Sequence, residues 1–519
     1  SGEKVSVINS EPDEVMEEEV EVTSNEAALM EPSANATSKM ILSSPPQQRN
    51  AETYKEIKEN SFVAVAQQPV TTFSADVDRA AYGNVRRIIG YGQIPPKDAV
   101  RIEEMVNYFD YDYPAPEEGS ASPLRVSPEL APAPWNPNHL LLRIGLQAKK
   151  IDLAKAPPSN IVFLIDVSGS MDEENKLPLL KSSFKMLLGQ LRPDDKIAIV
   201  TYANGTKVAL PSTRVKDKEK IIKVLDNLYA SGGTSGGRGI QLAYEQAQKS
   251  FIKNGNNRII LATDGDFNIG INNTTDLEKF IEKQRESGIY MSVLGFGMGN
   301  YRDDMAETIA DKGNGNYAYI DNITEAKKVL VNELSGTLFA VAKDVKLQLE
   351  FNPKYVKEYK LIGYENRMLA NEDFTNDKKD AGEIGAGHTV TALYELVPSD
   401  GKVAQSLRYQ SQELNEKGKG NELGFLKIRY KDPKVKDAKS VEITEPLVFN
   451  KKALKETSTD YRFAASVAEF GILLRDNSNK ANATYDQVIE LAEGAIGKDP
   501  EGYRKEFVRL VKSVKMLPK

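Results

Sequence analysis

Between Ile161 and about Ser335, short apolar runs alternate with amphipathic segments of helical period. The first run, Ile161–Ile165, is apolar at every position, as a strand buried on both faces should be. Repeated alternation of this kind predicts an α/β fold with a doubly wound, mainly parallel sheet and helices on both faces, which we place at residues 155–338. Further strands are expected at Lys196–Tyr202, Arg258–Thr263, Tyr290–Phe296 and Asn316–Ile320, with Thr206–Leu210 as a hairpin partner.

On the C-terminal side of this domain the hydrophobic period falls to two. The segment Val345–Phe351 alternates apolar and polar residues, so we predict a β-sandwich over residues 340–452. Residues 121–150 also form extended strands in this interpretation and are expected to join the sandwich from the other side. If they do, Leu140–Leu146 pairs with Val345–Phe351, and the α/β domain is an insertion between sandwich strands.

The remaining ordered regions are predicted to contain helices. In residues 53–120, a strand at Val70–Val77 is followed by a helix that Asp78 is expected to cap, because a short acidic side chain can accept hydrogen bonds from the first helical amides. In residues 456–519, apolar residues recur at helical spacing and predict a C-terminal helical region.

The amino-terminal segment, residues 1–52, differs in composition from the rest. Its first fifty residues carry ten acids and three bases, and seven of the acids lie between Glu11 and Glu21. A segment this acidic buries too little apolar surface to order itself, so we predict a disordered tether. A solubility tail without a further role is the alternative. The chain begins Ser1-Gly2, as a mature or trimmed product does, which is compatible with the removal of a targeting segment.

Composition excludes several classes of function. The 519 residues include no cysteine, which removes disulfides, thiol catalysis and Cys-ligated zinc. The two histidines, His139 and His388, are far apart, which argues against a multi-histidine metal site. The chain after its acidic start is neutral, so we predict no nucleic-acid partner. No apolar run approaches the about 18 residues of a membrane helix, so no transmembrane segment is expected.

Three separated clusters carry the residues suited to chemistry. Asp166, Ser168 and Ser170 follow the first buried strand, Thr234 follows a pair of glycines, and Asp264 follows the strand Arg258–Thr263. Ligands of doubly wound sheets bind at the carboxyl ends of strands, where the strand order reverses. Carboxylates and hydroxyls are hard oxygen donors, which suit Mg²⁺ or Ca²⁺ better than softer metals. The sequence therefore predicts a divalent-cation site at this edge of the sheet.

The pattern Asp166-Val-Ser168-Gly-Ser170 with Thr234 and Asp264 resembles the metal-ion-dependent adhesion site of von Willebrand factor type A domains. The resemblance implies that these five residues hold Mg²⁺, or Ca²⁺ or Mn²⁺ in its place. It also implies that a Glu or Asp of a partner protein completes the coordination. The cation would then remain open to an external carboxylate.

The segments outside this domain resemble a bacterial type A domain family as well. Thr72–Asp78 and Pro95–Phe109 are similar to its amino-terminal region, and Tyr461–Phe470 and Gly502–Phe507 to its carboxy-terminal region. That family is often exported or lipid-anchored. The resemblance therefore implies an extracytoplasmic location at the bacterial cell envelope, periplasmic or associated with the outer membrane, with room for a lipid anchor upstream of residue 1.

These observations favour a metal-dependent protein-binding module for adhesion or assembly, whose partner is an unidentified protein that presents an Asp or Glu. A metal-independent structural scaffold of an envelope complex is the alternative. An enzyme is the third hypothesis, and we predict against it because no histidine or cysteine adjoins the three clusters to serve as base or nucleophile. We accordingly assign no catalytic residue and no organic cofactor.

Overall fold

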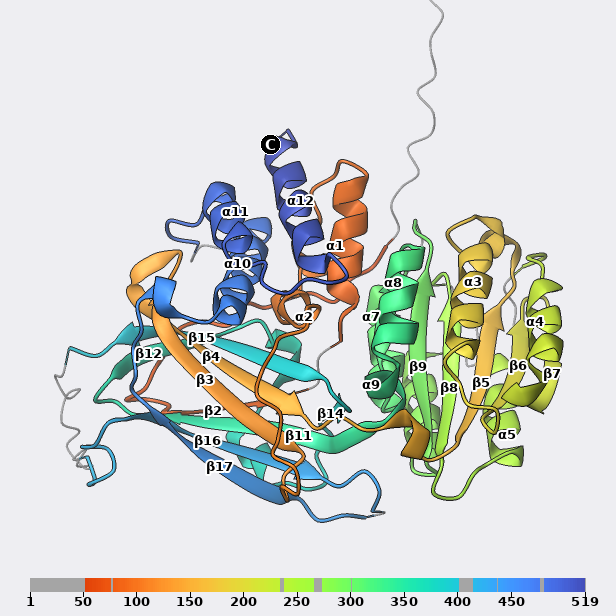
Figure 1. The fold of residues 1–519 in the computed structure, drawn as a ribbon, viewed down its shortest axis with the longest axis horizontal. Helices are drawn as coiled ribbons and strands as arrows, with labels where there is room; N and C mark the ends of the chain where they lie inside the picture. The colour runs from red at the N-terminus through yellow and green to blue at the C-terminus, as the bar shows by residue number, and fades with distance from the viewer. Residues whose placement is uncertain are drawn as a thin grey trace, which may run out of the picture. The chain divides into compact units, whose positions relative to one another are not determined.

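Six strands of the central α/β domain form one sheet in the order β10-β9-β8-β5-β6-β7 (Figure 1). All neighbours are parallel except β7, which returns antiparallel to β6 as predicted. Their bounds are β5 Ser159–Asp166, β6 Lys196–Tyr202, β7 Thr206–Arg214, β8 Asn256–Thr263, β9 Ile289–Phe296 and β10 Tyr317–Ile320. Because β6 and β8 add to opposite sides of β5, the strand order reverses between β5 and β8.

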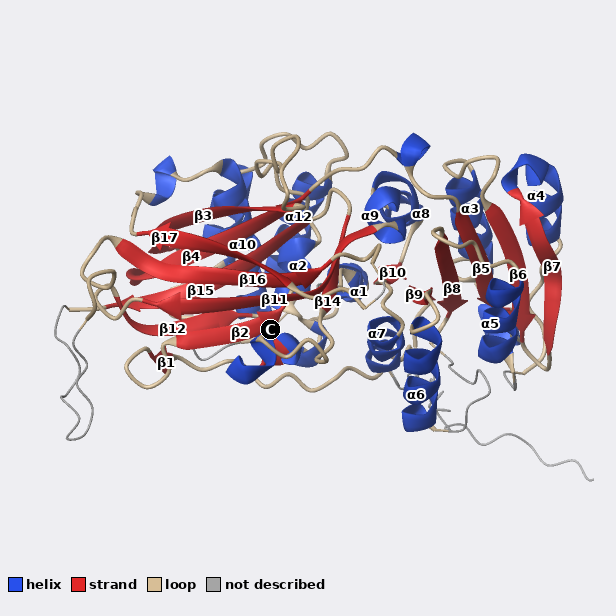
Figure 2. Cartoon of the chain, turned by 90° about the horizontal axis from the view of Figure 1, so that it is seen from below, coloured by secondary structure: helices blue, strands red, loops and turns tan. Residues whose placement is uncertain are grey.

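Helices cover both faces of this sheet (Figure 2). One face packs against α3 Leu177–Leu188, α4 Lys218–Asp226, α8 Ile323–Lys327 and α9 Leu334–Leu338, and the other against α5 Gly239–Lys249, α6 Thr274–Arg285 and α7 Asp303–Lys312. Every residue of β5 is buried, because successive side chains enter the two cores in turn. The predicted doubly wound α/β fold is confirmed.

The coordinates are a computed structural model that describes residues 52–75, 78–233, 238–265, 273–299, 301–400, 414–435, 437–476 and 480–518. The predicted tether lies outside the described residues except for its last residue. Glu52 is not free, since its carboxylate accepts hydrogen bonds from Arg87 at 2.8 Å and from the Gly299 amide at 3.0 Å. Among the described residues, no helix is long and apolar enough to cross a bilayer.

A β-sandwich surrounds a second core. One sheet has the order β1-β12-β15-β4-β3 and the other β13-β2-β11-β16-β17, with β14 paired to β11. The bounds are β1 Val63–Ala64, β2 Val70–Ser74, β3 Leu124–Ala133, β4 Asn136–Ala148, β11 Ala340–Phe351, β12 Val356–Ile362, β13 Met368–Leu369, β14 Gly382–Gly385, β15 Thr389–Pro398, β16 Glu422–Lys431 and β17 Val441–Val448. The α/β domain enters the chain between β4 and β11.

The predicted pairing of Leu140–Leu146 with Val345–Phe351 is wrong. β4, which contains Leu140–Leu146, pairs with β15 and β3, whereas β11 pairs with β2 and β16 in the opposite sheet. Both strands contribute apolar side chains to the same core. A period of two identifies the face that a strand buries and does not identify its neighbour.

The helices α1 Ala80–Gly90, α2 Ile102–Asn107, α10 Thr459–Leu474, α11 Tyr485–Glu493 and α12 Tyr503–Met516 form a third core, which also buries Trp135. Asp78 does not cap α1: its carboxylate accepts hydrogen bonds from the Tyr317 amide at 2.9 Å and from Arg367 at 3.0 Å. The amide of Ala81, in the first turn, instead donates to Glu104 at 2.9 Å. A carboxylate from another helix thus replaces the local cap.

Candidate metal centre

The first cluster lies at the end of β5, in the loop that leads into a short 3-10 helix, Gly169–Asp172. Asp166 and Ser168 are buried, while Ser170 is exposed. The Ser168 amide donates to Asp166 Oδ1 at 2.8 Å, and the hydroxyls of Ser168 and Ser170 lie 3.0 Å apart. This turn gathers the serine oxygens beside each other and fixes one oxygen of the carboxylate.

The second cluster is described up to Gly233, and Thr234 lies outside the described residues. The loop before it is joined to the first cluster by two backbone hydrogen bonds: the Gly169 amide donates to the Gly232 carbonyl at 2.8 Å, and the Ser231 amide to the Val167 carbonyl at 2.9 Å. Gly232 has a φ of +75°, a conformation that favours glycine. The loop that precedes Thr234 therefore contacts the serine loop.

The third cluster follows β8. Asp264 is 7% exposed, and its Oδ1 accepts no hydrogen bond from the described residues. The turn is enforced at Gly265, whose φ is +98° and where an added Cβ would lie 2.7 Å from the Tyr301 Cα. β5 and β8 are adjacent and parallel, with Ile165 opposite Ala262. Asp166 and Asp264 therefore leave neighbouring strands at the same edge, where the strand order reverses.

A lysine that sequence reasoning missed joins the first and third clusters. Lys176, buried just before α3, places its ammonium 3.2 Å from Asp264 Oδ2. The same ammonium donates to the Ser170 carbonyl at 2.8 Å and to Glu173 at 3.2 Å. No local pattern marks this lysine, because its partners come from two loops distant in sequence.

A second residue missed by the sequence is Asn204, whose side-chain oxygen accepts a hydrogen bond from the Gly233 amide at 2.7 Å. It follows β6 and holds the loop that precedes Thr234. Polar residues after each strand of a doubly wound sheet are the signal that pointed to Asp166 and Asp264, and the same signal applied to β6 would have found Asn204.

The donor set fits a hard divalent cation. The groups that would hold it are the carboxylates of Asp166 and Asp264 and the hydroxyls of Ser168 and Ser170, all oxygen donors. Asp264 Oδ1 is a buried acceptor atom with no donor among the described residues, and leaving such an atom unsatisfied costs about 1–3 kcal/mol. A cation bound at this point would supply the missing partner. Both histidines lie elsewhere: His139 contacts Glu395 at 2.6 Å, and His388 packs against Gly336.

Three family descriptions match consecutive parts of the chain. The von Willebrand factor type A domain matches residues 160–332, a family described as von Willebrand factor matches residues 48–143, and the C-terminal family of the uncharacterized protein YfbK matches residues 336–517. Similarity thus extends on both sides of the α/β domain.

Individual proteins match over different lengths. YfbK of Escherichia coli (strain K12) is 47% identical over 465 residues, which cover 88% of this chain and 80% of that protein. Calcium-activated chloride channel regulator 1 of Bos taurus is 22% identical over 40% of this chain and 22% of that protein. Among solved structures, a von Willebrand factor type A protein from Catenulispora acidiphila is 14% identical, with a TM-score of 0.41 over 88% of this chain and 91% of that chain.

Proposed function

Because this chain belongs to the same protein family as Escherichia coli YfbK and contains a von Willebrand factor type A domain, we propose that it is a metal-dependent protein-binding module. Type A domains generally mediate protein–protein interaction, often with a metal. In our proposal Asp166, Ser168, Ser170, Thr234 and Asp264 hold Mg²⁺, or Ca²⁺ or Mn²⁺ in its place. The cation captures an Asp or Glu side chain of a partner protein.

The observation that carries this proposal is the position of Asp264 beside Asp166 and the missing hydrogen-bond donor at its Oδ1. Asp264 leaves β8 beside Asp166 on β5, and its buried Oδ1 accepts no hydrogen bond from the described residues. A buried charged oxygen without a donor is expected to have a cation as its partner. The serine hydroxyls beside Asp166 are neutral, so they add donors without cancelling the charge of the cation.

The charges near the centre allow an anionic ligand. Two carboxylates balance a divalent cation, and the Lys176 ammonium, 3.2 Å from Asp264, is itself paired with Glu173 at 3.2 Å. No negative excess therefore repels a carboxylate from a partner at an open position of the cation. This is the chemical basis on which we propose an acidic side chain as the group that is recognised.

We propose a binding centre and not a catalytic one. Among the described residues, Lys176 contacts the proposed metal ligand Asp264, and its ammonium is occupied by three acceptors: Asp264, Ser170 and Glu173. These contacts leave it no free N–H to direct at a substrate. A turnover screen of ester and phosphate substrates with Mg²⁺ and Mn²⁺ tests this point, and metal-dependent hydrolysis that Asp166→Ala removes would overturn it.

We also propose a location at the bacterial cell envelope, outside the cytoplasm. The support is the similarity of both flanking regions to a family whose members are often predicted to be exported. Fractionation of cells that express the native gene tests the location. Recovery with the envelope fraction is expected, and recovery in the cytosol would contradict it.

The binding proposal is tested by affinity capture from native envelope extract with immobilised chain. Capture of a specific partner is expected with Mg²⁺ and is expected to be lost with a chelator and in Asp166→Ala. The matched control is Asp172→Ala, which removes an exposed acid from the same loop and should retain the partner. Equal capture by wild type and Asp166→Ala, with or without chelator, would contradict metal-dependent capture and favour the scaffold alternative.

A further inference from the structure

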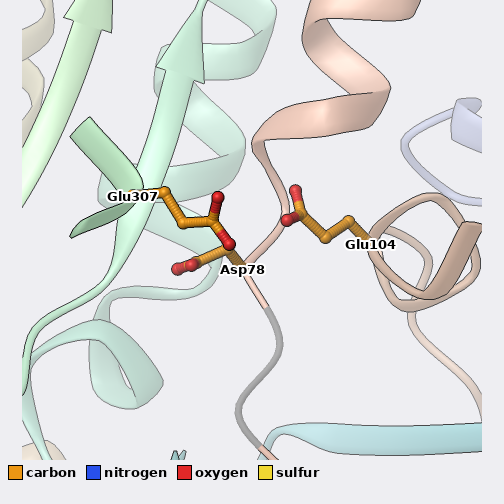
Figure 3. A group of neighbouring side chains, drawn as sticks. All are labelled: Asp78, Glu104 and Glu307. Atoms are coloured by element: carbon orange, nitrogen blue, oxygen red, sulfur yellow. The ribbon is translucent and has the colours of Figure 1, made fainter. Parts of the chain in front are cut away.

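A second group of carboxylates lies away from the five residues discussed so far. Asp78 precedes α1, Glu104 belongs to α2 and Glu307 to α7 (Figure 3). In Figure 3 the carboxyl groups of Glu307 and Glu104 face each other, and that of Asp78 lies beside Glu307. Each offers a carboxylate oxygen, and these three oxygens all lie within 4.8 Å of one another. The residues are 5%, 2% and 3% exposed, respectively, so water screens their mutual repulsion weakly.

The arginines around this group do not balance its charge. Arg101 forms salt bridges with Glu104 and, at 2.5 Å, with Asp303. Arg367 forms salt bridges with Asp78 at 3.0 Å and with Glu307 at 3.4 Å. Four buried carboxylates thus face two guanidinium groups, an excess of two negative charges. The four carboxylates are Asp78, Glu104, Asp303 and Glu307. Buried charge is stable only when it is compensated, and a cation bound among these carboxylates would compensate it.

One oxygen of the group lacks a partner. The side chain of Glu307 is only 4% exposed, and its buried Oε2 accepts no hydrogen bond from the described residues. Water therefore cannot easily take the place of the missing donor. The other carboxylate oxygen of Glu307 accepts the 3.4 Å bond from Arg367.

We propose that Asp78, Glu104 and Glu307 hold one hard divalent cation of the Ca²⁺ or Mn²⁺ type, at a site separate from that of Asp166 and Asp264. One such ion offsets the negative charge of the three carboxylates and gives Glu307 Oε2 a partner. Two oxygens on opposite sides of Ca²⁺ lie about 4.6–5.2 Å apart, which accommodates oxygens within 4.8 Å of one another. The two sites share no residue.

The position of this site gives the ion a structural role. Asp78 and Glu104 belong to the segment between the sandwich strands β2 and β3, whereas Glu307 belongs to α7 of the α/β domain. An ion bound by all three joins those regions. We therefore expect bound Ca²⁺ to raise the thermal midpoint of the full chain even when the site at Asp166 is disabled.

The experiment counts Mn²⁺ ions bound to the metal-free full chain by electron paramagnetic resonance. Two ions are expected for the wild type, one for Asp166→Ala, one for Glu307→Gln and none for the double variant. Asp311→Asn is the matched control, because Asp311 bonds the same arginine, Arg367, at 2.6 Å without belonging to the group of three, and it should retain two ions.

The inference is overturned if Glu307→Gln binds as many ions as the wild type. A different result separates the two proposals: the wild type binds one ion, Asp166→Ala retains it and Glu307→Gln loses it. The site at Glu307 would then stand, and the proposed metal site at Asp166 would fail. If Glu307→Gln does not fold, anomalous diffraction from Mn²⁺-soaked wild-type crystals shows whether an ion binds among the three carboxylates. A peak among the three carboxylates is expected, and none there at saturating Mn²⁺ overturns the inference.

Discussion

At the scale of single residues, Lys176 places a positive charge beside the proposed metal ligands. Its ammonium lies 3.2 Å from Asp264 Oδ2, where it pairs with a carboxylate and repels a nearby cation. We predict that Lys176→Met tightens Mg²⁺ binding by about tenfold, or about 1.4 kcal/mol, because removal of the like charge outweighs the loss of the ion pairs with Asp264 and Glu173. Isothermal calorimetry measures the change.

The matched control for this prediction is Lys185→Met, on the same helix, whose ammonium pairs with the exposed Asp226 at 2.5 Å. It should leave the Mg²⁺ affinity unchanged. Weaker Mg²⁺ binding in Lys176→Met would show instead that the lysine holds the loops of Ser170 and Asp264 in place, and that its repulsion of the cation is the smaller effect.

A buried acid in α10 predicts a pH dependence. Burial raises the pKa of Glu469 to about 8, against a smaller lowering by the Thr484 backbone. The unfolded chain ionises this group near its ordinary pKa of 4.5, whereas the folded chain retains the proton up to about 8. Below pH 4.5 Glu469 is protonated in both states and does not change the free energy of unfolding of the wild type. From pH 4.5 to pH 8 that free energy falls by about 1.4 kcal/mol per pH unit, because only the unfolded chain releases the proton.

The substitution Glu469→Gln removes that slope. We expect the stability difference between this variant and the wild type to grow from pH 5 to pH 8, in favour of the variant, and to level off above pH 8. Urea unfolding at a series of pH values measures it. A difference that is constant from pH 5 to pH 9 would contradict the raised pKa of Glu469.

At this scale, the sequence predicted the proposed metal ligands that belong to one recognisable motif. Asp166, Ser168, Ser170 and Asp264 follow strands, and that position is visible in the hydrophobic pattern. Lys176 and Glu307 could not be found in this way, because their partners belong to loops or domains that come together only in three dimensions. The capping role expected for Asp78 failed for the same reason.

At the scale of elements, the sequence predicted which segments are strands and helices better than which strands are neighbours. The parallel arrangement of the α/β sheet followed from a repeated local unit, in which strands alternate with helices. The sandwich offered no such unit, and β4 pairs with β15, a strand that is more than 240 residues away. Several strands share the same alternation of apolar and polar residues, so the sequence alone does not show which of them pairs with β4.

The strand β4 contains a glycine whose role is steric. An added Cβ at Gly145 would lie 2.6 Å from the ring of Tyr113, which also packs against Arg143 with the guanidinium carbon 4.6 Å from the ring centroid. We predict that Gly145→Ala destabilises the chain by about 1–3 kcal/mol, because overpacking displaces the ring. Denaturant unfolding measures the loss.

The control is Gly90→Ala, at the end of α1, where an added Cβ meets nothing within 4 Å, and which should be neutral or slightly stabilising. Replacement of Tyr113 by Leu in the Gly145→Ala background should restore part of the lost stability. If Gly145→Ala is as stable as the wild type, the ring does not pack against this position.

At the scale of the whole molecule, the α/β domain is an insertion that buried ion pairs join to the regions around it. Arg86 on α1 is the clearest case, since it bonds Asp321 at 2.5 Å and Glu325 at 2.8 Å in the α/β domain, and Glu506 at 3.0 Å on α12. The sequence predicted the insertion from its flanking strands. It could not predict the residues that join the regions, since charged residues form no periodic pattern.

We predict that Arg86→Met lowers the free energy of unfolding by about 3 kcal/mol, because it leaves two nearly buried carboxylates without their counterion. Differential scanning calorimetry of the full chain measures the effect. Arg214→Met is the control, because its pair with Asp194 is largely exposed, and it should change the stability by less than about 1 kcal/mol. Equal effects of the two substitutions would contradict a joining role for Arg86.

The central claim is that oxygen atoms of Asp166 and of the loops beside it hold a divalent cation in the α/β domain. Its most direct test is a Mg²⁺ titration by isothermal calorimetry of the metal-free wild-type chain and of Asp166→Ala, with circular dichroism to show that both are folded. The account predicts that the wild type binds one Mg²⁺ more per chain than Asp166→Ala. Identical stoichiometry and affinity for the two chains would contradict it.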